Sequence, residues 1–176
     1  NKMNLKFEKI NSSSEEIDIL RLKCFKNFEE KGFPTKKQEH WKYTDLKTII
    51  NNNFEDLQIY NENKNLKFDN KLLINVFEHN RVVFLNGNLI DTNFSFENKK
   101  KIKIQSLKKA LQNKTDFEKI KNNFEDNQNS MISLNHALAN DGMLLEVEDN
   151  YSFTKPLVIY NFFDKMSENK IINSKI

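Results

Sequence analysis

The periodicity of the sequence changes at residue 81, and this change constrains the fold more than any other feature. Upstream, "SSSEEIDILRLKCFKNFEEKG" places Ile17, Leu20, Cys24 and Phe28 at three- and four-residue intervals, as on one face of a helix. Downstream, "RVVFLNGNLI" has β-branched and aromatic residues on both sides of Asn-Gly, a pattern typical of a β-hairpin. The two patterns together predict an α+β fold.

Polar residues suited to N-caps precede several further helical segments. Thr35 with Gln38 offers a capping box at the start of "KKQEHWKY", and "NKLLINVFEH" is compatible with a short helix. Gly32 and Gly142 are expected to end the first and last helices. The expected caps are Ser12 or Ser13 for the first helix, Thr44 for "DLKTII", Ser106 for "SLKKALQN", Thr115 for "TDFEKIKNNFE" and Ser130 for "SMISLNHALANDG".

Strand patterns dominate the remainder of the chain. "KIKIQ", "GMLLEVEDN", "KPLVIYNFFD" and "KIINSKI" are each expected to form a strand. The last of them has no following residue to cover its edge, and open sheet edges tend to pair with other chains. The sequence is therefore expected to be the front part of a longer polypeptide, and this fragment is expected to self-associate through its terminal strand.

Composition and charge give little support to nucleic-acid or membrane binding. The chain has 28 Lys and Arg against 25 Asp and Glu, interspersed along the sequence, and we interpret Lys99–Lys101 with nearby Lys103 as a solvated turn. No segment approaches the roughly 18 apolar residues of a membrane span, and the first residues lack a signal-peptide core. A single cysteine, Cys24, suits a reducing compartment, so we expect a cytoplasmic protein.

The sequence carries no motif for catalysis, metal binding or nucleotide binding. His40, His79 and His136 are isolated from one another and from Cys24, whereas metal sites require clustered ligands. The three glycines are far apart, so no phosphate-binding loop is predicted. We expect no enzymatic activity and no cofactor within this chain. An enzyme with a site assembled from scattered acidic residues is the least favoured alternative.

Rare residues gather in "GFPTKKQEHWKYTDL", residues 32–46, here called the signature corner. Abundant Asn and Lys suggest the codon bias of an AT-rich genome, whereas this segment holds the single Trp, one of two Pro and one of three His. One interpretation is a structural corner with Trp41 and Tyr43 anchored in the core. The other is a recognition surface, because Trp and Tyr are typical interface residues. The two interpretations are compatible.

The signature corner resembles the N-terminal signature of the SufD family, which belongs to the Suf system of iron–sulfur cluster assembly. "WKYTDL" favours SufD over the paralogous SufB family, and Phe33 is a conservative departure from the signature. "RVVFLNGNLI" and the later segment containing Lys155-Pro156-Leu157 resemble SufD as well. The matching corner positions are Gly32, Pro34, Thr35, Lys36, Lys37, Glu39, Trp41, Lys42, Tyr43, Thr44 and Leu46.

The resemblance implies two domains. The first is a mostly helical N-terminal domain over residues 1–141, with strands near 81–91 and 101–105. The second, over residues 142–176, is the start of a truncated right-handed parallel β-helix.

The resemblance also implies a non-catalytic scaffold that works with SufB-like and SufC-like proteins. In that family the cluster ligands and most partner contacts lie late in the β-helix and in a C-terminal helical region, beyond Ile176. No family ligand position falls on Cys24, His40, His79 or His136. A free-standing adaptor module for protein–protein interaction is the alternative function.

Overall fold

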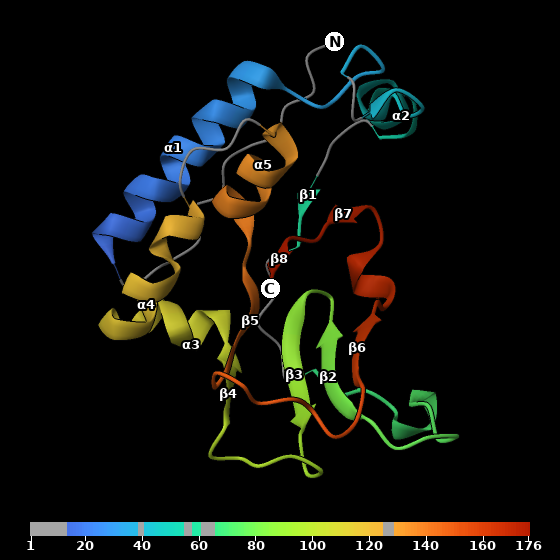
Figure 1. The fold of residues 1–176 in the computed structure, drawn as a ribbon. Helices are drawn as coiled ribbons and strands as arrows, with labels where there is room; N and C mark the ends of the chain where they lie inside the picture. Colours follow the sequence, from blue (N-terminus) through green and yellow to red (C-terminus); the bar gives the residue numbers. More distant parts are fainter. Residues whose placement is uncertain (1–13, 39–40, 55–57, 61–65, 125–128) are drawn as a thin grey trace.

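A computed structural model describes residues 14–38, 41–54, 58–60, 66–124 and 129–176. Helices and strands are both present, which confirms the α+β expectation (Figure 1). None of the helices in the described residues is long and apolar enough to cross a membrane. The helices are α1 (Glu15–Lys31), α2 (Leu46–Asn53), α3 (Leu107–Gln112), α4 (Lys114–Ile120) and α5 (Ser130–Leu138), with 3₁₀ turns at Asn70–Leu72, Lys121–Phe124 and Lys165–Ser167.

The strands form three small sheets. β2 lies between β3 and β6, β5 lies between β4 and β8, and β1 pairs with β7. Antiparallel pairing joins β2 to β3 and β4 to β5, and the other three pairings are parallel. The strands are β1 (Gln58–Ile59), β2 (Asn80–Leu85), β3 (Asn88–Asn93), β4 (Ile102–Ser106), β5 (Asp141–Val147), β6 (Leu157–Phe162), β7 (Lys170–Ile171) and β8 (Ser174–Lys175).

Helix α1 packs with its predicted apolar face against the other helices. Ile17, Cys24 and Phe28 are buried, so the expected core position of Cys24 is confirmed. The helix ends at Gly32, whose φ of 67° is positive and whose N–H donates to the Phe28 carbonyl at 2.6 Å. Glycine takes this conformation at no steric cost, which explains the termination.

Two buried clusters fill the helical side of the molecule. The first lies between α1 and α5 and reaches α2; the second lies between α3, α4 and the N-terminal end of α1. Burial of this kind, rather than helix propensity, supplies most of the stability of short helices. The first cluster is Cys24, Phe25, Phe28, Phe33, Ile50, Leu134, Ala137 and Leu138, and the second is Ile17, Leu107, Ala110, Leu111, Phe117, Ile120, Phe124 and Ala139.

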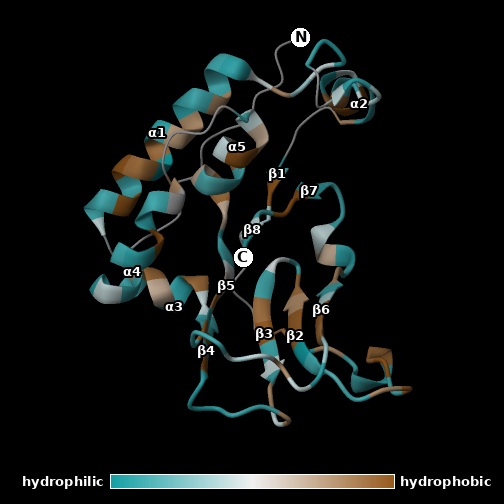
Figure 2. Ribbon diagram, in the orientation of Figure 1, coloured by the Kyte–Doolittle hydropathy of each residue, from teal (hydrophilic) through white to brown (hydrophobic). Residues whose placement is uncertain are grey.

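The predicted hairpin is confirmed as β2 and β3. Asn86 and Gly87 connect the strands with φ of 48° and 78°, and positive φ at both central residues defines a type I′ turn. Val82 and Val83 are fully buried and Phe84 is 1% exposed. In Figure 2, hydrophobic colouring covers most of β2 and part of β3, whereas it alternates with hydrophilic colouring along α1.

Asp141, the first residue of β5, ties the hairpin to the helical side. One of its carboxylate oxygens accepts a hydrogen bond from the Leu89 N–H at 2.9 Å, and the other accepts from the Lys108 N–H at 3.3 Å. Because Leu89 lies in β3 and Lys108 in α3, this buried carboxylate fixes the position of β3 relative to β5 and α3.

Glu97 holds a second junction, between the β3–β4 connection and the segment that enters β6. Its carboxylate accepts from the side-chain amide of Asn80 at 2.8 Å and from the N–H groups of Thr154 and Lys155 at 2.9 and 3.1 Å. The Tyr151 hydroxyl donates to the same carboxylate. Burial acts to raise the pKa of Glu97, but hydrogen bonds from Tyr151, Asn80, Thr154 and Lys155 outweigh it and lower the pKa to about 2.

Several predicted helix ends were wrong by one to three residues. The predicted caps Ser12 and Ser13 lie outside the described residues, and Ser14 occupies the N-cap of α1. The cap of α3 is Ser106 as expected, but Asp45, Asn113 and Asn129 replace Thr44, Thr115 and Ser130 as caps of α2, α4 and α5. Asn and Asp are better N-caps than Thr, which explains two of these shifts. Helix α5 ends at Leu138, and Gly142 lies inside β5 instead.

Parts of the remaining predictions also change. "NKLLINVFEH" forms only the 3₁₀ turn Asn70–Leu72, and "KIINSKI" is divided into the two short strands β7 and β8. A β-helix is not formed by the described residues, and their sheets are open. β5 and β6, from the predicted second domain, pair with β4 and β2 from the first. These pairings cross the predicted domain boundary between residues 141 and 142, and that boundary stays a prediction.

Candidate functional site

The signature corner connects α1 to α2 through three consecutive turns. N–H groups of Gln38, Trp41 and Thr44 donate to the carbonyls of Thr35, Gln38 and Trp41 at 2.8–3.0 Å, each a three-residue step. These turns take the place of the helix predicted for "KKQEHWKY", in the residues of that segment that the structure describes. Glu39 and His40 lie outside the described residues.

The two ends of the corner are anchored in the core. Phe33 and Pro34 are buried, and the Phe33 ring packs edge-on against Phe28 with 5.0 Å between ring centroids. Leu46 begins α2 and packs, partly buried, against the first core cluster. The Asp45 side chain accepts from the Thr48 N–H at 3.0 Å and fixes the start of α2. The corner is therefore held at its termini by apolar contacts.

The middle of the corner faces solvent. Tyr43 is 88% exposed, so its predicted role as a core anchor is wrong, and Trp41 is only half-buried. The Lys42 ammonium lies 5.7 Å from the centroid of the Tyr43 ring, a cation–π geometry. Lys36 and Lys37 are exposed as well, while Thr35 and Thr44 are half-buried. The exposure of Tyr43 favours the recognition-surface interpretation, because Tyr is enriched at protein interfaces.

A second candidate site lies at the junction of β3, β4, β5 and α4. It is an open groove of about 940 Å³, here called the cationic groove, with lysines that outnumber the acidic side chains. Sequence interpretation treated Lys99–Lys101 as a solvated turn and missed the groove, because Lys119 and β5 join it only through the fold. Its lining residues are Thr92, Asn93, Phe94, Ser95, Lys99, Lys100, Lys101, Ile102, Lys103, Ile104, Lys119, Glu146, Val147 and Glu148.

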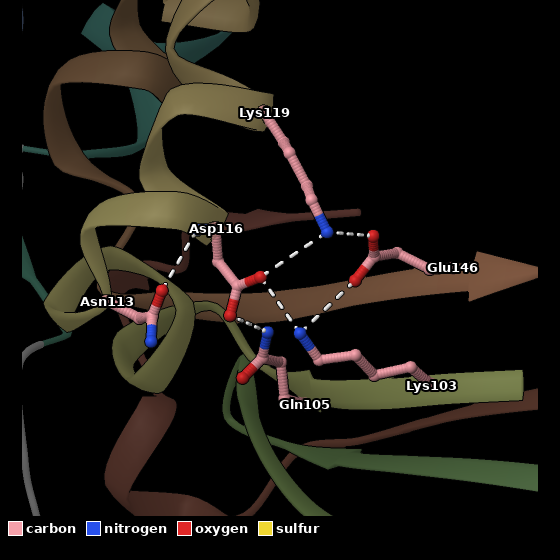
Figure 3. Close-up of polar contacts among 6 residues, drawn as sticks. All are labelled: Lys103, Gln105, Asn113, Asp116, Lys119 and Glu146. Carbon is pink, nitrogen blue, oxygen red and sulfur yellow. Dashed lines mark hydrogen bonds and ion pairs between the residues drawn. The ribbon is translucent and has the colours of Figure 1, made fainter.

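A balanced network of charges occupies one wall of the groove (Figure 3). Lys103 of β4 donates to the buried Asp116 of α4 at 2.9 Å and lies 3.4 Å from Glu146 of β5. Lys119 pairs with Glu146 and lies 3.6 Å from Asp116. The Gln105 amide donates to the second Asp116 oxygen at 2.7 Å. The network joins the sheet to α4.

These contacts favour the ionised forms of Lys103, Asp116 and Glu146. Hydrogen bonds from Lys103 and then Gln105 lower the pKa of Asp116, and the hydrogen bond from Lys119 lowers the pKa of Glu146. The bond to Asp116 raises the pKa of Lys103. Because cations and carboxylates alternate, this wall of the groove is polar but nearly neutral.

The histidines in the described residues have structural contacts. His79 Nε2 lies 2.7 Å from the Tyr160 hydroxyl, and His136 Nε2 lies 3.0 Å from the Lys175 ammonium. Burial, followed by the nearby Lys175 charge, lowers the pKa of His136 to about 4. Within the described ranges, no group of three or more His, Cys, Asp or Glu side chains is placed to hold a metal ion.

Comparison with protein-family models matches the chain to a known family. The model described as the SufBD protein N-terminal region matches residues 6–159, which include the whole signature corner, the hairpin and the cationic groove. Comparison with curated proteins gives no match. Because the match extends over most of the 176 residues, the chain belongs to the SufBD N-terminal region family and thereby to the proteins of Suf iron–sulfur cluster assembly.

Proposed function

We propose that this chain is part of a non-catalytic scaffold subunit for iron–sulfur cluster assembly, which works with a SufB-like protein and a SufC-like ATPase. The family match over residues 6–159 carries this proposal. The surface of the signature corner supports it, because the exposed aromatic ring of Tyr43 suits contact with a partner protein.

Within the family, the chain is of the SufD kind. "WKYTDL", residues 41–46, supports this assignment because SufB follows the shared Trp with different residues. We also propose that β5–β8 lead into a parallel β-helix. Parallel ladders are what such a helix requires, and β2–β6, β5–β8 and β1–β7 are all parallel.

The assembling cluster is cargo of the complex rather than a cofactor of this chain. Its ligands would come from other parts of the assembly, and we propose neither nucleic acid nor membrane as a partner. A cytoplasmic location and self-association through the terminal strand remain part of the same proposal. β8 lies at the edge of its sheet among the described residues, which supports the second point.

Co-purification tests the scaffold role. The protein that contains this chain, affinity-tagged in its native host, is expected to retrieve SufB-like and SufC-like proteins in fixed ratio by native mass spectrometry. A matched variant, Tyr43→Ala, separates the contribution of the signature corner from that of the rest of the protein. Retrieval of neither partner would contradict the proposal.

The adaptor module is the second candidate, and the 88% exposure of Tyr43 favours it. The same purification distinguishes the two functions. A partner outside the Suf system that is lost in Tyr43→Ala, with no SufB-like or SufC-like protein present, would support the adaptor instead.

A further inference from the structure

The cationic groove runs beside the open edge of strand β4. In its sheet, β4 pairs with β5 on one side, and among the residues that the structure describes no strand pairs with its other side. Ile102 and Ile104 of β4 both line the groove. An open strand edge next to a groove is the arrangement that proteins use to bind an extended peptide as an added strand.

The register shows which residues of β4 present their backbone to the groove. The Glu148 N–H donates to the Lys101 carbonyl at 2.9 Å, and the pairing continues with Ile102 opposite Val147 and Lys103 opposite Glu146. Hydrogen-bonded and non-hydrogen-bonded pairs alternate in an antiparallel ladder. The N–H and C=O of Lys103 therefore point to β5, and those of Ile102 and Ile104 point away from it.

The charges along the groove indicate which kind of peptide could pair with the open edge of β4. Lys103 and Lys119 are balanced by Asp116 and Glu146, and Lys101 pairs with Glu148 at 2.7 Å. Lys99 and Lys100 are exposed, line the groove immediately before β4, and have no acidic partner within the described ranges. Two ammonium groups at one end of an open strand favour carboxylates at the matching end of a ligand.

We propose that the cationic groove binds an extended acidic segment of a partner protein, which adds to β4 as a strand. Backbone groups of Ile102 and Ile104 form its ladder, and Lys99 and Lys100 pair with its acidic side chains. This inference does not rest on the proposed scaffold function, since it follows from the edge, the register and the charges alone.

Two other ligands fit the groove less well. Single-stranded nucleic acid requires exposed aromatic rings for stacking, and Phe94, the only aromatic residue among those that line the groove, is 9% exposed. A second copy of this chain would place one lysine-rich β4 edge against another, and like charges directly opposite are destabilising. Both remain outcomes of the test below.

The first experiment measures binding of synthetic peptides to the chain by fluorescence anisotropy. The probe is a labelled heptapeptide in which glutamate alternates with valine. One control replaces each glutamate with lysine, and a second keeps the glutamates but methylates the backbone amides on one edge. We expect the glutamate peptide to bind and both controls to lose at least about tenfold in affinity, because one loses the charge pairing and the other the ladder donors.

Variants of the chain locate the site. Lys99→Glu combined with Lys100→Glu is expected to weaken binding at least about tenfold. Lys23→Glu combined with Lys26→Glu is the matched control, because it makes the same charge change at exposed positions of α1, away from the groove. The control is expected to keep affinity within about twofold, apart from a general salt-dependent effect.

Amide hydrogen exchange gives a readout that charge alone cannot produce. On binding, the N–H groups of Ile102 and Ile104 are expected to gain protection, whereas those of Lys103 and Gln105, already bonded to β5, are expected to change little. Equal binding of the methylated peptide, or loss of affinity in the α1 control equal to that in the groove variant, would overturn the proposal. So would tighter binding of oligothymidylate than of the glutamate peptide, or a dimer through β4.

Discussion

The β2–β3 hairpin and the signature corner are both recognisable in the sequence, yet they are built in opposite ways. In the hairpin, Val82, Val83 and Phe84 are buried, and the turn residues take the conformation that the strands require. In the corner, the rare aromatic residue Trp41 is half-buried and Tyr43 is exposed. In the signature corner, the rare aromatic residues therefore lie at or near the surface. In the hairpin, common β-branched residues form the core. Substitutions in the two regions should have correspondingly different costs.

The largest expected difference in the free energy of unfolding is between the variants Phe84→Ala and Trp41→Ala. Phe84 is 1% exposed, and truncation of a buried Phe costs about 3–5 kcal/mol because it leaves a cavity. Trp41 is half-buried, so we expect a loss of about 1–2 kcal/mol. Urea unfolding followed by circular dichroism measures both. Equal losses would remove the contrast between the regions.

Glu97→Gln should have the next largest effect, and it makes a prediction about pH. The folded-state pKa of about 2 lies below the ordinary value of 4.5, so the ionised carboxylate stabilises the fold above about pH 4.5. That contribution is lost as the pH falls through the folded pKa. The variant is expected to be less stable at pH 7, because a glutamine amide has one acceptor oxygen and cannot accept hydrogen bonds from all the donors that surround the Glu97 carboxylate.

The measurement is the free energy of unfolding between pH 7 and pH 2.5 for both proteins. We expect a shallower decline with acidification in Glu97→Gln than in the unmodified chain, and Glu118→Gln, at a less buried carboxylate of α4, serves as the control. Parallel curves for the variant and the unmodified chain would show that Glu97 does not titrate as described.

Replacing one glycine in each region with alanine compares the stability of the hairpin and the signature corner again, with smaller expected losses. Gly87 in the hairpin has φ of 78°, and an added Cβ would lie 2.6 Å from the Ile172 side chain, so strain and contact add to about 1–3 kcal/mol. Gly32 at the corner has φ of 67° and ψ of −169° with open space around it, so only backbone strain of about 1–2 kcal/mol applies there. Thermal unfolding of the two variants tests this order, and a larger loss at Gly32 would reverse it.

Tyr43→Ala is expected to have the smallest effect on stability, within about 0.5 kcal/mol, because the ring is almost fully exposed. Its effect should appear instead as weaker retrieval of partner proteins, with Tyr43→Phe as the conservative control that keeps the ring. Unfolding free energy and co-purification yield are measured on the same preparations. A loss of stability above about 2 kcal/mol would place Tyr43 in a packed environment after all.

Local patterns predicted the secondary structure well where one residue type decides it. Asn86-Gly87 defined the hairpin turn, and the spacing of Ile17, Cys24 and Phe28 defined the buried face of α1. The starts of α4 and α5 were not predictable from the abundance of asparagine, because codon bias places Asn at many positions that have no structural role. Asn113 and Asn129 nevertheless cap α4 and α5 with their side chains. An amino acid that is common for genomic reasons can therefore still have a specific structural role.

Long-range arrangement could not be read from the same patterns. The cationic groove combines Lys99–Lys101 with Lys119 and Glu146, and nothing in their local sequence indicates that α4 and β5 meet β4. The exposure of Tyr43 has the same origin, because burial depends on what packs over a turn and not on the turn itself. The parallel pairing of β2 with β6 was likewise not predictable from periodicity.

The central position of β2 has a consequence for how the chain reaches its native state. Its partner β3 follows after a two-residue turn, so this hairpin can form within microseconds. Its other partner, β6, lies far downstream, and closing so long a loop slows folding because entropy is lost before contacts are gained. During synthesis, the hairpin would leave the ribosome well before β6 and wait with one edge uncovered. Chaperone dependence of the nascent chain should therefore peak in that interval.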